Sequence, residues 1–471
     1  MIKAKKTQSV KLRPPIVSVL GHVDHGKTTL LDALRKTSVA SREAGGITQT
    51  IGASMVVTSA GGKITFIDTP GHAAFSKMRS RGTSASDIAI LAVAADDGVK
   101  PQTIESLKYI KEAKIPYIVA LTKTDLASAS AEKVKGQLEK EGILFEGRGG
   151  DVPLVSVSAK AGTGLKDLLE IVLLLAEVNE VKGDPKDPLE AVVIETSKGK
   201  QGSVVSVVVK DGTLKVAEIV SADEISTKVR GLFNHLGKSV KEILPGEPGQ
   251  ILGFSSLPSV GSRLKSEVEI TLSEEKIGSS RIKDTEGGLP VLIKAKSSGA
   301  LEAVLGSIPK GIFVLGSGVG DINESDIFLA KSGQTSKIFA YGVKVSANVL
   351  RLAQTEDIKI ESFEIIYELL ERLAVLLKKE EKEIFGKAEI IASFPLDDKR
   401  VAGCKVIEGR IARGDSLVLS RGETETGKVK AVSMKKMKKE INKAELGEEF
   451  GILLEPQLDF QKGDMLVSVR K

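Results

Sequence analysis

The chain has 471 residues, and its composition is that of a folded protein with several domains. Apolar residues make up 41% and charged residues 28% of the sequence, which are ordinary shares for globular domains. The single cysteine excludes an internal disulfide and fits a reducing compartment, so we expect a cytoplasmic protein. Because the sequence has no membrane-length apolar run and no expected signal peptide, we expect no membrane partner.

The positive charge is concentrated at the beginning of the sequence. The formal net charge is +6, and residues 1–13 carry five basic side chains and no acidic one. The rest of the chain is therefore close to neutral, and net charge alone does not indicate a nucleic-acid-binding protein. The basic segment is either a solvated tail or an arm that contacts RNA phosphates.

Residues 14–181 alternate between short apolar segments and amphipathic ones. This alternation predicts a largely parallel sheet with helices on both faces. The expected strands lie at residues 16–20, 64–67, 88–94, 115–121 and 154–157. The expected helices include residues 28–35, 103–111 and 165–176.

Beyond residue 181 the pattern changes several times, which indicates further domains. Short strands with glycine-rich turns predict a small β-barrel, and a polar connector then precedes renewed α/β alternation. A strongly amphipathic helix follows, and short strands recur after it. We therefore predict a multidomain α/β and β protein divided into a basic tail (1–13), a phosphate-loop α/β domain (14–181), a β-barrel (189–263), a connector (264–288), an α/β/α domain (289–362), a connecting helix (363–384) and a C-terminal β-barrel (387–471).

A phosphate-binding motif follows the first expected strand. Residues 21–28 read GHVDHGKT and match G-x-x-x-x-G-K-[ST] between a strand and a helix, which is the context that the motif requires. Backbone N–H groups then face the phosphates, Lys27 reaches the terminal phosphates, and the Thr28 hydroxyl binds Mg²⁺. The expected nucleotide-binding residues of this loop are Gly21, His22, Val23, Asp24, His25, Gly26, Lys27, Thr28 and Thr29.

Three short segments at the ends of later strands complete a nucleotide site. Asp68 is expected to hold Mg²⁺ through water, and the Gly71 N–H is expected to contact the γ-phosphate. The Asp125 carboxylate can accept from two N–H donors of guanine that adenine does not offer together, which selects GTP over ATP. The remaining base-pocket residues are expected at Thr122, Lys123, Ser158, Ala159 and Lys160, where the Ala159 N–H can donate to guanine O6.

The segments GHVDHGKTTL and DTPGHAAF resemble those of translational GTPases, and AGGITQTIGA resembles the first switch of bacterial-type initiation factor 2. The resemblance implies that Thr48 is a second Mg²⁺ ligand when this switch closes on GTP. It also implies that His72 is the catalytic residue, which orients the attacking water. Thr122 stands where the family has asparagine, and this difference concerns the strength of guanine binding more than the identity of the base.

The resemblance extends over nearly the whole chain. Residues 228–254 resemble the second domain of initiation factor 2, and residues 289–304 and 318–330 resemble its third domain, which relays the nucleotide state. Residues 402–415 resemble its final domain, which in the family binds the formyl-methionyl end of initiator tRNA.

The final domain departs from the family pattern at two positions. Met437 replaces an aromatic residue, and Phe450 replaces a small thiol and can offer a flat surface to the amino-acid end of the tRNA. Two alternatives remain open, because the lysines can form a solvated face and Cys404 can be a buried structural thiol. The tRNA-binding residues implied by the resemblance are Cys404, Lys435, Lys436, Lys438, Glu449, Phe450 and Gly451.

The resemblance implies a monomeric initiation factor with GTP or GDP and Mg²⁺ as its cofactors. Such a factor promotes binding of initiator formyl-methionyl-tRNA to the small ribosomal subunit, then joining of the large subunit. Because no arginine stands in an obvious stabilising position, we expect slow hydrolysis by the protein alone and stimulation by the ribosome. The alternatives are another translational GTPase, such as an elongation or specialised tRNA-delivery factor, and a metabolic GTPase subunit of the sulfate-activation type.

Overall fold

The computed structural model describes most of the chain, in two compact units, Met1–Leu373 and Ala374–Lys471. Among the described residues, no helix is both long enough and apolar enough to cross a membrane. The described residues are 12–35, 48–199, 201–266, 288–333, 335, 337–380, 384–396, 399–422, 424–437 and 439–469.

The first part of the chain folds around a six-stranded sheet of order β2-β3-β1-β4-β5-β6, in which only β2 is antiparallel to its neighbour. The central strands IVSVLG and IAILAVA are buried along their whole length, as expected of a sheet covered on both faces. The predicted, largely parallel sheet is thus confirmed. Its elements are β1 (Ile16–Gly21), α1 (Lys27–Arg35), β2 (Gly52–Val57), β3 (Lys63–Asp68), α2 (Ser76–Ala85), β4 (Ile88–Ala94), α3 (Pro101–Ala113), β5 (Tyr117–Thr122), α4 (Ala131–Lys140), β6 (Leu154–Ser156) and α5 (Leu165–Val178).

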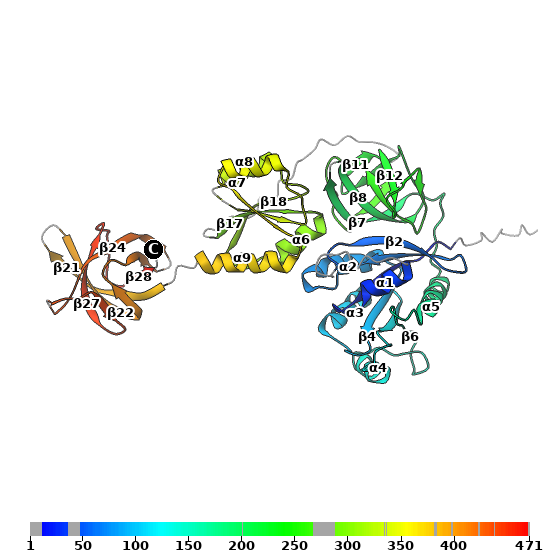
Figure 1. The fold of residues 1–471 in the computed structure, drawn as a ribbon, viewed down its shortest axis with the longest axis horizontal. Coiled ribbons are helices and arrows are strands. Elements are labelled where there is room, and N and C mark those ends of the chain that lie inside the picture. Colours follow the sequence, from blue (N-terminus) through cyan, green and yellow to red (C-terminus); the bar gives the residue numbers. More distant parts are fainter. Residues whose placement is uncertain are drawn as a thin grey trace, which may run out of the picture. The chain divides into compact units, whose positions relative to one another are not determined.

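Helices cover both faces of this sheet (Figure 1). One apolar core joins the strands to α1 and α5, and a second joins them to α3 and α4. Because the strands β1, β3, β4, β5 and β6 are parallel, their carboxyl ends meet at one edge of the sheet. The loops that carry the predicted nucleotide-binding residues leave from this edge.

A β-rich segment follows, as predicted. Its main sheet has the order β11-β10-β16-β7-β8-β15-β12-β13, and β9 pairs separately with β14. Alternate residues of β8, such as Val205, Val207 and Val209, are fully buried, which places one face of the strand in the core. The strands are β7 (Glu190–Gly199), β8 (Gly202–Asp211), β9 (Leu214–Lys215), β10 (Ile219–Ala222), β11 (Ile225–Lys228), β12 (Gly231–Asn234), β13 (Ser239–Val240), β14 (Glu242–Ile243), β15 (Pro248–Leu252) and β16 (Arg263–Ser266).

The next sheet is parallel, with the order β18-β17-β19-β20, and α7 and α8 cover one face while α6 and α9 lie on the other (Figure 1). The expected α/β/α arrangement is therefore present. The connecting helix is shorter than predicted, because Phe363 ends β20 and Ile384 begins β21. The elements are β17 (Leu289–Ala295), α6 (Ser298–Ser307), β18 (Ile312–Val319), α7 (Glu324–Ser332), β19 (Lys337–Tyr341), α8 (Ala347–Thr355), β20 (Lys359–Phe363) and α9 (Ile366–Glu380).

The N-terminus of α6 is held by strand β7 of the preceding β-rich segment. The buried Glu195 carboxylate accepts hydrogen bonds from Ser297 Oγ at 2.8 Å and from Gly299 N at 3.1 Å. Further along α6, Glu302 forms ion pairs with Lys77 and Arg81 of α2. Helix α6 is therefore anchored both to the β-rich segment and to the helix that follows the DTPGH loop.

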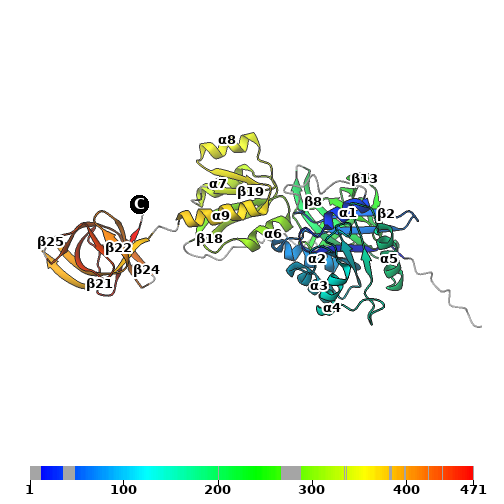
Figure 2. The ribbon, with the colours of Figure 1, turned by 60° about the horizontal axis from the view of Figure 1, so that its bottom comes forward.

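The C-terminal unit contains a closed barrel. Strands β21, β28, β23, β24, β27 and β22 pair in that order, and β22 pairs again with β21 to close the ring (Figure 2). Apolar side chains of these strands fill its core. The strands are β21 (Ile384–Leu396), β22 (Lys399–Ala412), β23 (Ser416–Arg421), β24 (Thr424–Lys436), β25 (Lys439–Glu440), β26 (Lys443–Glu445), β27 (Glu449–Glu455) and β28 (Met465–Val469).

The last residue of the predicted basic tail is packed against the first part of the chain, contrary to the prediction. Arg13 is not part of a solvated tail or a free arm, because its guanidinium pairs with both carboxylate oxygens of Asp87 at 2.6 and 2.8 Å. Its side chain is only 6% exposed, so it is fixed to the first sheet. Residues 1–11, which carry the four lysines of the segment, lie outside the described residues.

Gly21, at the end of β1, provides a test of how closely β1 packs against β4. Its φ is 139°, and a Cβ would lie 2.3 Å from the carbonyl oxygen of Ala92 in the central strand β4. We expect Gly21→Ala to lower the free energy of unfolding by about 2–4 kcal/mol, measured by calorimetry. The control is Gly136→Ala in α4, where no atom lies within 4 Å of the added Cβ and alanine should stabilise the helix. Equal losses of stability would contradict the steric explanation.

Candidate functional site

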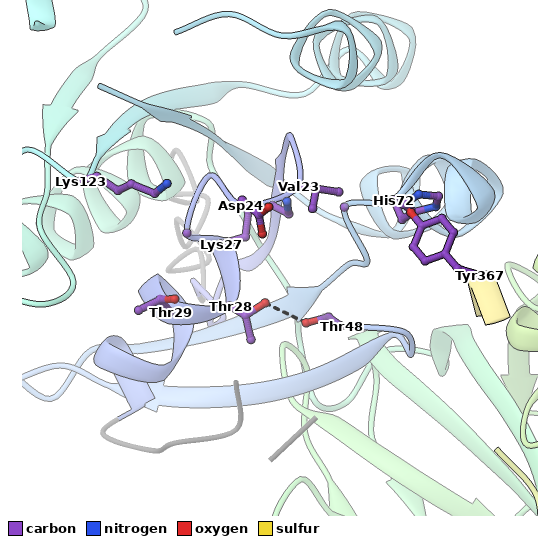
Figure 3. A pocket seen from close by; sticks show the side chains of 11 residues that line it. Val23, Asp24, Lys27, Thr28, Thr29, Thr48, His72, Lys123 and Tyr367 are labelled. Carbon is purple, nitrogen blue, oxygen red and sulfur yellow. Dashed lines mark hydrogen bonds between the residues drawn. The ribbon is translucent and has the colours of Figure 1, made fainter. Parts of the chain in front are cut away.

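A cavity of about 370 Å³ lies at the carboxyl edge of the first sheet, within the size range of small-molecule sites (Figure 3). Residues of the GHVDHGKT loop form one side of it, and residues of three later loops and of α9 form the rest. The lining residues are Val23, Asp24, Gly26, Lys27, Thr28, Thr29, Thr48, Gly71, His72, Lys123 and Tyr367.

The loop between β1 and α1 has the backbone of a phosphate-binding loop. Asp24 and Gly26 adopt positive φ values of 61° and 76°, and α1 begins at Lys27, so the first N–H groups of the helix lie beside the cavity. The predicted residues Gly21, His22 and His25 belong to the same loop but do not line the cavity. The loop therefore offers backbone donors and one lysine to an anion.

Lys27 is a buried cation. Its side chain is 6% exposed, and its Nζ donates to the carbonyl oxygen of His22. Burial lowers the pKa of Lys27 to about 8, while the charge of Asp68 acts in the opposite direction. A Cβ on Gly71 would lie 2.4 Å from Nζ, so a larger residue there would displace the end of the lysine side chain. An anionic ligand in the cavity would compensate the desolvated ammonium group.

The three predicted Mg²⁺ ligands are hard oxygen donors, and two of them, Thr28 and Thr48, line the cavity. Thr28 Oγ1 and Thr48 Oγ1 lie 2.8 Å apart, although 20 residues separate them in the sequence. Asp68 ends β3 and is 6% exposed. Two hydroxyls and a carboxylate suit Mg²⁺, which prefers oxygen ligands and retains several waters. The residues present therefore fit this ion.

The predicted base-binding segments also come together. Ser158 Oγ donates to the Asp125 carboxylate at 2.6 Å and accepts from Ala161 N at 3.0 Å. The hydrogen bond from Ser158 lowers the pKa of Asp125, which therefore remains ionised and can accept two N–H donors. The exposed Lys160 and the half-buried Ala159 follow Ser158 in the same loop.

Thr122 connects the base-binding segment to the phosphate loop. Its hydroxyl donates to the carbonyl oxygen of His25 at 2.7 Å, and its side chain is only 4% exposed. A short hydroxyl side chain at this position therefore joins the two loops. Lys123, which follows with a φ of 56°, lines the cavity.

His25 is a buried residue of the phosphate loop. Its side chain is 1% exposed, and burial, followed by the neighbouring His22, lowers its pKa to about 4. The imidazole is therefore neutral at physiological pH and packs edge-to-face with His22, with ring centroids 5.1 Å apart. The backbone carbonyl oxygens of His22 and His25 accept from Lys27 and Thr122.

His72 lies on the loop that follows β3. Its Nδ1 accepts from Ala74 N at 3.2 Å, and burial, followed by the charge of Arg79, lowers its pKa. Arg79 is fully buried, donates to the carbonyl oxygens of Pro70 and His72, and pairs with both oxygens of Glu105 at 2.9 Å. This arginine fixes the backbone of the DTPGH loop.

In the C-terminal barrel, the implied tRNA-binding residues lie on three neighbouring strands. Cys404 of β22 pairs with Phe450 of β27, and Gly451 of β27 pairs with Lys435 of β24. Lys435 and Glu449 are exposed, while Lys436 is half-buried and pairs with Glu448 at 2.7 Å. Lys438 lies outside the described residues.

The expectation that Phe450 offers a flat surface to a ligand is wrong for this structure. Phe450 is 4% exposed, Cys404 is fully buried, and both belong to the barrel core. Burial raises the pKa of the Cys404 thiol to about 12, as expected of a structural cysteine. The physical reason is strand alternation, which turns Phe450 inward and its neighbours Glu449 and Gly451 outward.

Family models match three parts of the chain: the elongation factor Tu GTP binding domain at residues 13–178, elongation factor G domain 2 at residues 188–267, and translation-initiation factor 2 at residues 262–374. The translation initiation factor IF-2 of Halothermothrix orenii is 40% identical over 98% of this chain and 72% of its own length. This chain belongs to the IF-2 family. The factors of Dehalococcoides mccartyi and Caulobacter vibrioides are 38% and 40% identical over 98% of the chain, which spans 83% and 49% of their lengths.

Membership of the IF-2 family decides between the predicted alternatives. Because the similarity covers 98% of the chain, it includes the third sheet and the C-terminal barrel as well as the nucleotide-binding part. This protein therefore belongs neither to the elongation factors nor to the metabolic GTPase subunits of the sulfate-activation type. The prediction of a translational GTPase that binds guanine nucleotides is confirmed.

Three residues of this IF-2 family site were not predicted from the sequence. Tyr367 lacks a local signal, because its contact with His72 joins segments distant in sequence. Arg79 bonds to nearby Pro70 and His72 and to Glu105 of α3, but no motif marked it. Gln49 follows Thr48 directly, and its buried amide bonds to Tyr341 of β19, to the Glu364 carbonyl oxygen and to Ile366 N at the start of α9. Its position inside the AGGITQTIGA segment was the only available signal.

The base-binding geometry predicts a change of nucleotide preference in Asp125→Asn. An asparagine amide presents one donor where the carboxylate accepts, so one N–H of guanine loses its partner. We expect GDP affinity to fall by about tenfold to a hundredfold and xanthosine diphosphate to bind better than it does to the parent, measured by calorimetric titration. The control is Asp151→Asn at an exposed loop position. Unchanged GDP affinity in Asp125→Asn would exclude Asp125 from base recognition.

Proposed function

We propose that this protein is a GTP-dependent translation initiation factor that hydrolyses GTP on the ribosome. The observation that carries the proposal is the meeting of Thr28 and Thr48 at 2.8 Å in the cavity that also contains Lys27 and His72. The segment that contains Thr48 is thus closed onto the phosphate loop. The name shared by the relatives, translation initiation factor, supports the same activity.

The nucleotide would lie with its phosphates on the loop from Gly21 to Thr29 and its base against Asp125. Thr28, Thr48 and, through water, Asp68 would hold Mg²⁺, which neutralises charge on the phosphates when bound. The Gly71 N–H and the Lys27 ammonium would contact the γ-phosphate. Loss of that phosphate would release the segments that contain Thr48 and Gly71.

His72 would orient the water that attacks the γ-phosphate. Because burial and Arg79 lower its pKa, the ring is neutral at neutral pH. The bond from Ala74 N to Nδ1 then leaves the ring proton on Nε2, which can hold a water molecule. Arg79 is committed to Glu105 and two backbone carbonyls, so slow hydrolysis by the protein alone is expected.

The proposed partners are the two ribosomal subunits and initiator formyl-methionyl-tRNA. The C-terminal barrel would bind the tRNA through its outward-facing Lys435, Glu449 and Gly451, with Lys436 beside them and Cys404 and Phe450 packed underneath. Lysine side chains can meet tRNA phosphates. We propose that the nucleotide-binding domain spans residues 14–181, with Arg13 packed against it, and that the tRNA-binding barrel begins with β21 at Ile384, after the connecting helix Ile366–Glu380.

The catalytic proposal is tested by His72→Ala. We expect the variant to bind GTP like the parent but to lose about a hundredfold or more of its ribosome-stimulated hydrolysis, because no group then orients the water. Phosphate release is measured with and without both ribosomal subunits and formyl-methionyl initiator tRNA. His235→Ala, in the β-rich segment, is the matched histidine control.

Two results of this experiment would contradict the proposal. Equal stimulated rates in His72→Ala and the parent would exclude His72 as the catalytic residue. A parent protein that binds GTP but shows no stimulation by ribosomes would argue against the initiation role itself.

The tRNA proposal is tested by Lys435→Ala. Removing one phosphate contact should weaken binding of initiator tRNA and reduce the salt dependence of log K by about one unit of slope. Lys462→Ala is the control, because Lys462 is an exposed lysine of the same barrel outside the predicted set. Equal effects of the two substitutions on tRNA affinity and salt slope would indicate a general charge effect without a defined site.

A further inference from the structure

The peptide unit that joins His22 to Val23 in the phosphate loop is held on both of its sides. Its carbonyl oxygen, that of His22, accepts from Lys27 Nζ and, at 3.4 Å, from His25 N. Its N–H, that of Val23, donates to Gln102 Oε1 at 2.9 Å. Because a peptide unit is planar, a partner that fixes the N–H also fixes the direction of the carbonyl group. Gln102 therefore determines where the acceptor of the Lys27 ammonium lies.

Gln102 belongs to the first turn of α3, which is firmly attached to the sheet. Its carbonyl oxygen accepts from the fully buried Ser106 Oγ at 2.6 Å, and its side chain is half-buried. Leu107 and Ile110 of the same helix belong to the apolar core that contains Leu20 of β1. The acceptor for the phosphate loop is therefore presented by a rigid element and not by another loop.

The same side of α3 also holds the DTPGH loop. Glu105 follows Gln102 by three residues, so the two side chains are neighbours on the helix surface. Both oxygens of Glu105 accept from Arg79, the residue that fixes the DTPGH loop, at 2.9 Å. A Cβ on Gly71 of this loop would lie 2.4 Å from Lys27 Nζ. Helix α3 thus supports both of the loops that meet at this ammonium group.

We infer that Gln102 is a positioning residue for nucleotide binding, which holds Lys27 in place for the phosphates through the peptide unit between His22 and Val23. The inference rests on the proposed function, because it takes Lys27 as a ligand of the terminal phosphates. Without the Gln102 acceptor the peptide unit can rotate, and its carbonyl oxygen leaves the ammonium group. The lysine side chain must then be ordered when the nucleotide binds, which lowers affinity for the phosphates and leaves the base-binding residues unchanged.

The experiment compares GDP and GMP binding by the full chain and its Gln102→Met variant, which keeps the size of the side chain and removes the acceptor. We expect GDP affinity, measured by calorimetric titration with Mg²⁺, to fall by about threefold to tenfold, which corresponds to ordering one long side chain. GMP lacks the phosphates that Lys27 reaches. Its affinity, measured by competition with a fluorescent GDP, should therefore change by less than about twofold.

A matched control and a double variant separate this role from a general structural one. Gln137 of α4 makes the same kind of bond at the same distance, because its Oε1 accepts from Val99 N at 2.9 Å. Gln137→Met should therefore change GDP affinity by less than about twofold. In a Lys27→Ala background, Gln102→Met should have no further effect on GDP affinity, because it acts through the ammonium group that is missing.

Four results overturn the inference. The first is an unchanged GDP affinity in Gln102→Met. Equal losses of GDP and GMP affinity, or an equal loss in Gln137→Met, would mean that Gln102 only supports the fold of this region. An undiminished effect of Gln102→Met in the Lys27→Ala background would mean that it does not act through Lys27. Failure of the proposed function is seen separately, in the parent protein, as absence of ribosome-stimulated hydrolysis.

Discussion

A buried lysine ammonium is the constraint around which the nucleotide site is built. Lys27 is 6% exposed, and the surrounding groups compensate its charge only in part, since burial still lowers its pKa to about 8. Such a group requires an anion nearby, and the first N–H groups of α1 point to the same place. The close approach of Gly71 to the Lys27 Nζ brings the DTPGH loop to that anion.

The loops around this charge are held by residues outside the nucleotide-binding motifs. Arg79 fixes the DTPGH loop through Glu105, and Gln49 fixes the Thr48 segment to the start of α9. Helix α6 is anchored to β7 by Glu195 and to α2 by the ion pairs of Glu302. Tyr341 of β19 thus bonds to the Thr48 segment, and α6 contacts α2, the helix that follows the DTPGH loop. This arrangement fits the relay role implied for that part of the chain by the family resemblance.

In the C-terminal barrel, the closed ring of strands separates the implied tRNA-binding residues into two groups. Cys404 and Phe450 fill the core, where burial stabilises the barrel, and Lys435 and Glu449 remain outside for a polar partner. Replacement of a small thiol by a phenylalanine at position 450 therefore changes the packing beneath the outer face. On the described part of this face, a tRNA can meet the side chains of lysine and glutamate and the backbone at Gly451.

The sequence by itself determined the largely parallel first sheet, through its alternating apolar pattern, and the loop after β1, through a short motif at a strand end. The residues proposed to bind the base were likewise predicted from short motifs at strand ends. Strand and helix patterns also predicted the β-rich segment after residue 188, the α/β sheet and the C-terminal β-barrel. The sequence did not predict Gln49 and Tyr367, whose contacts join segments about 300 residues apart, nor Arg79, whose burial against the DTPGH loop and Glu105 depends on packing. Only the tertiary structure decided that Phe450 points inward and that the helix at residues 366–380 begins beside His72, since side-chain direction and helix placement are set by packing.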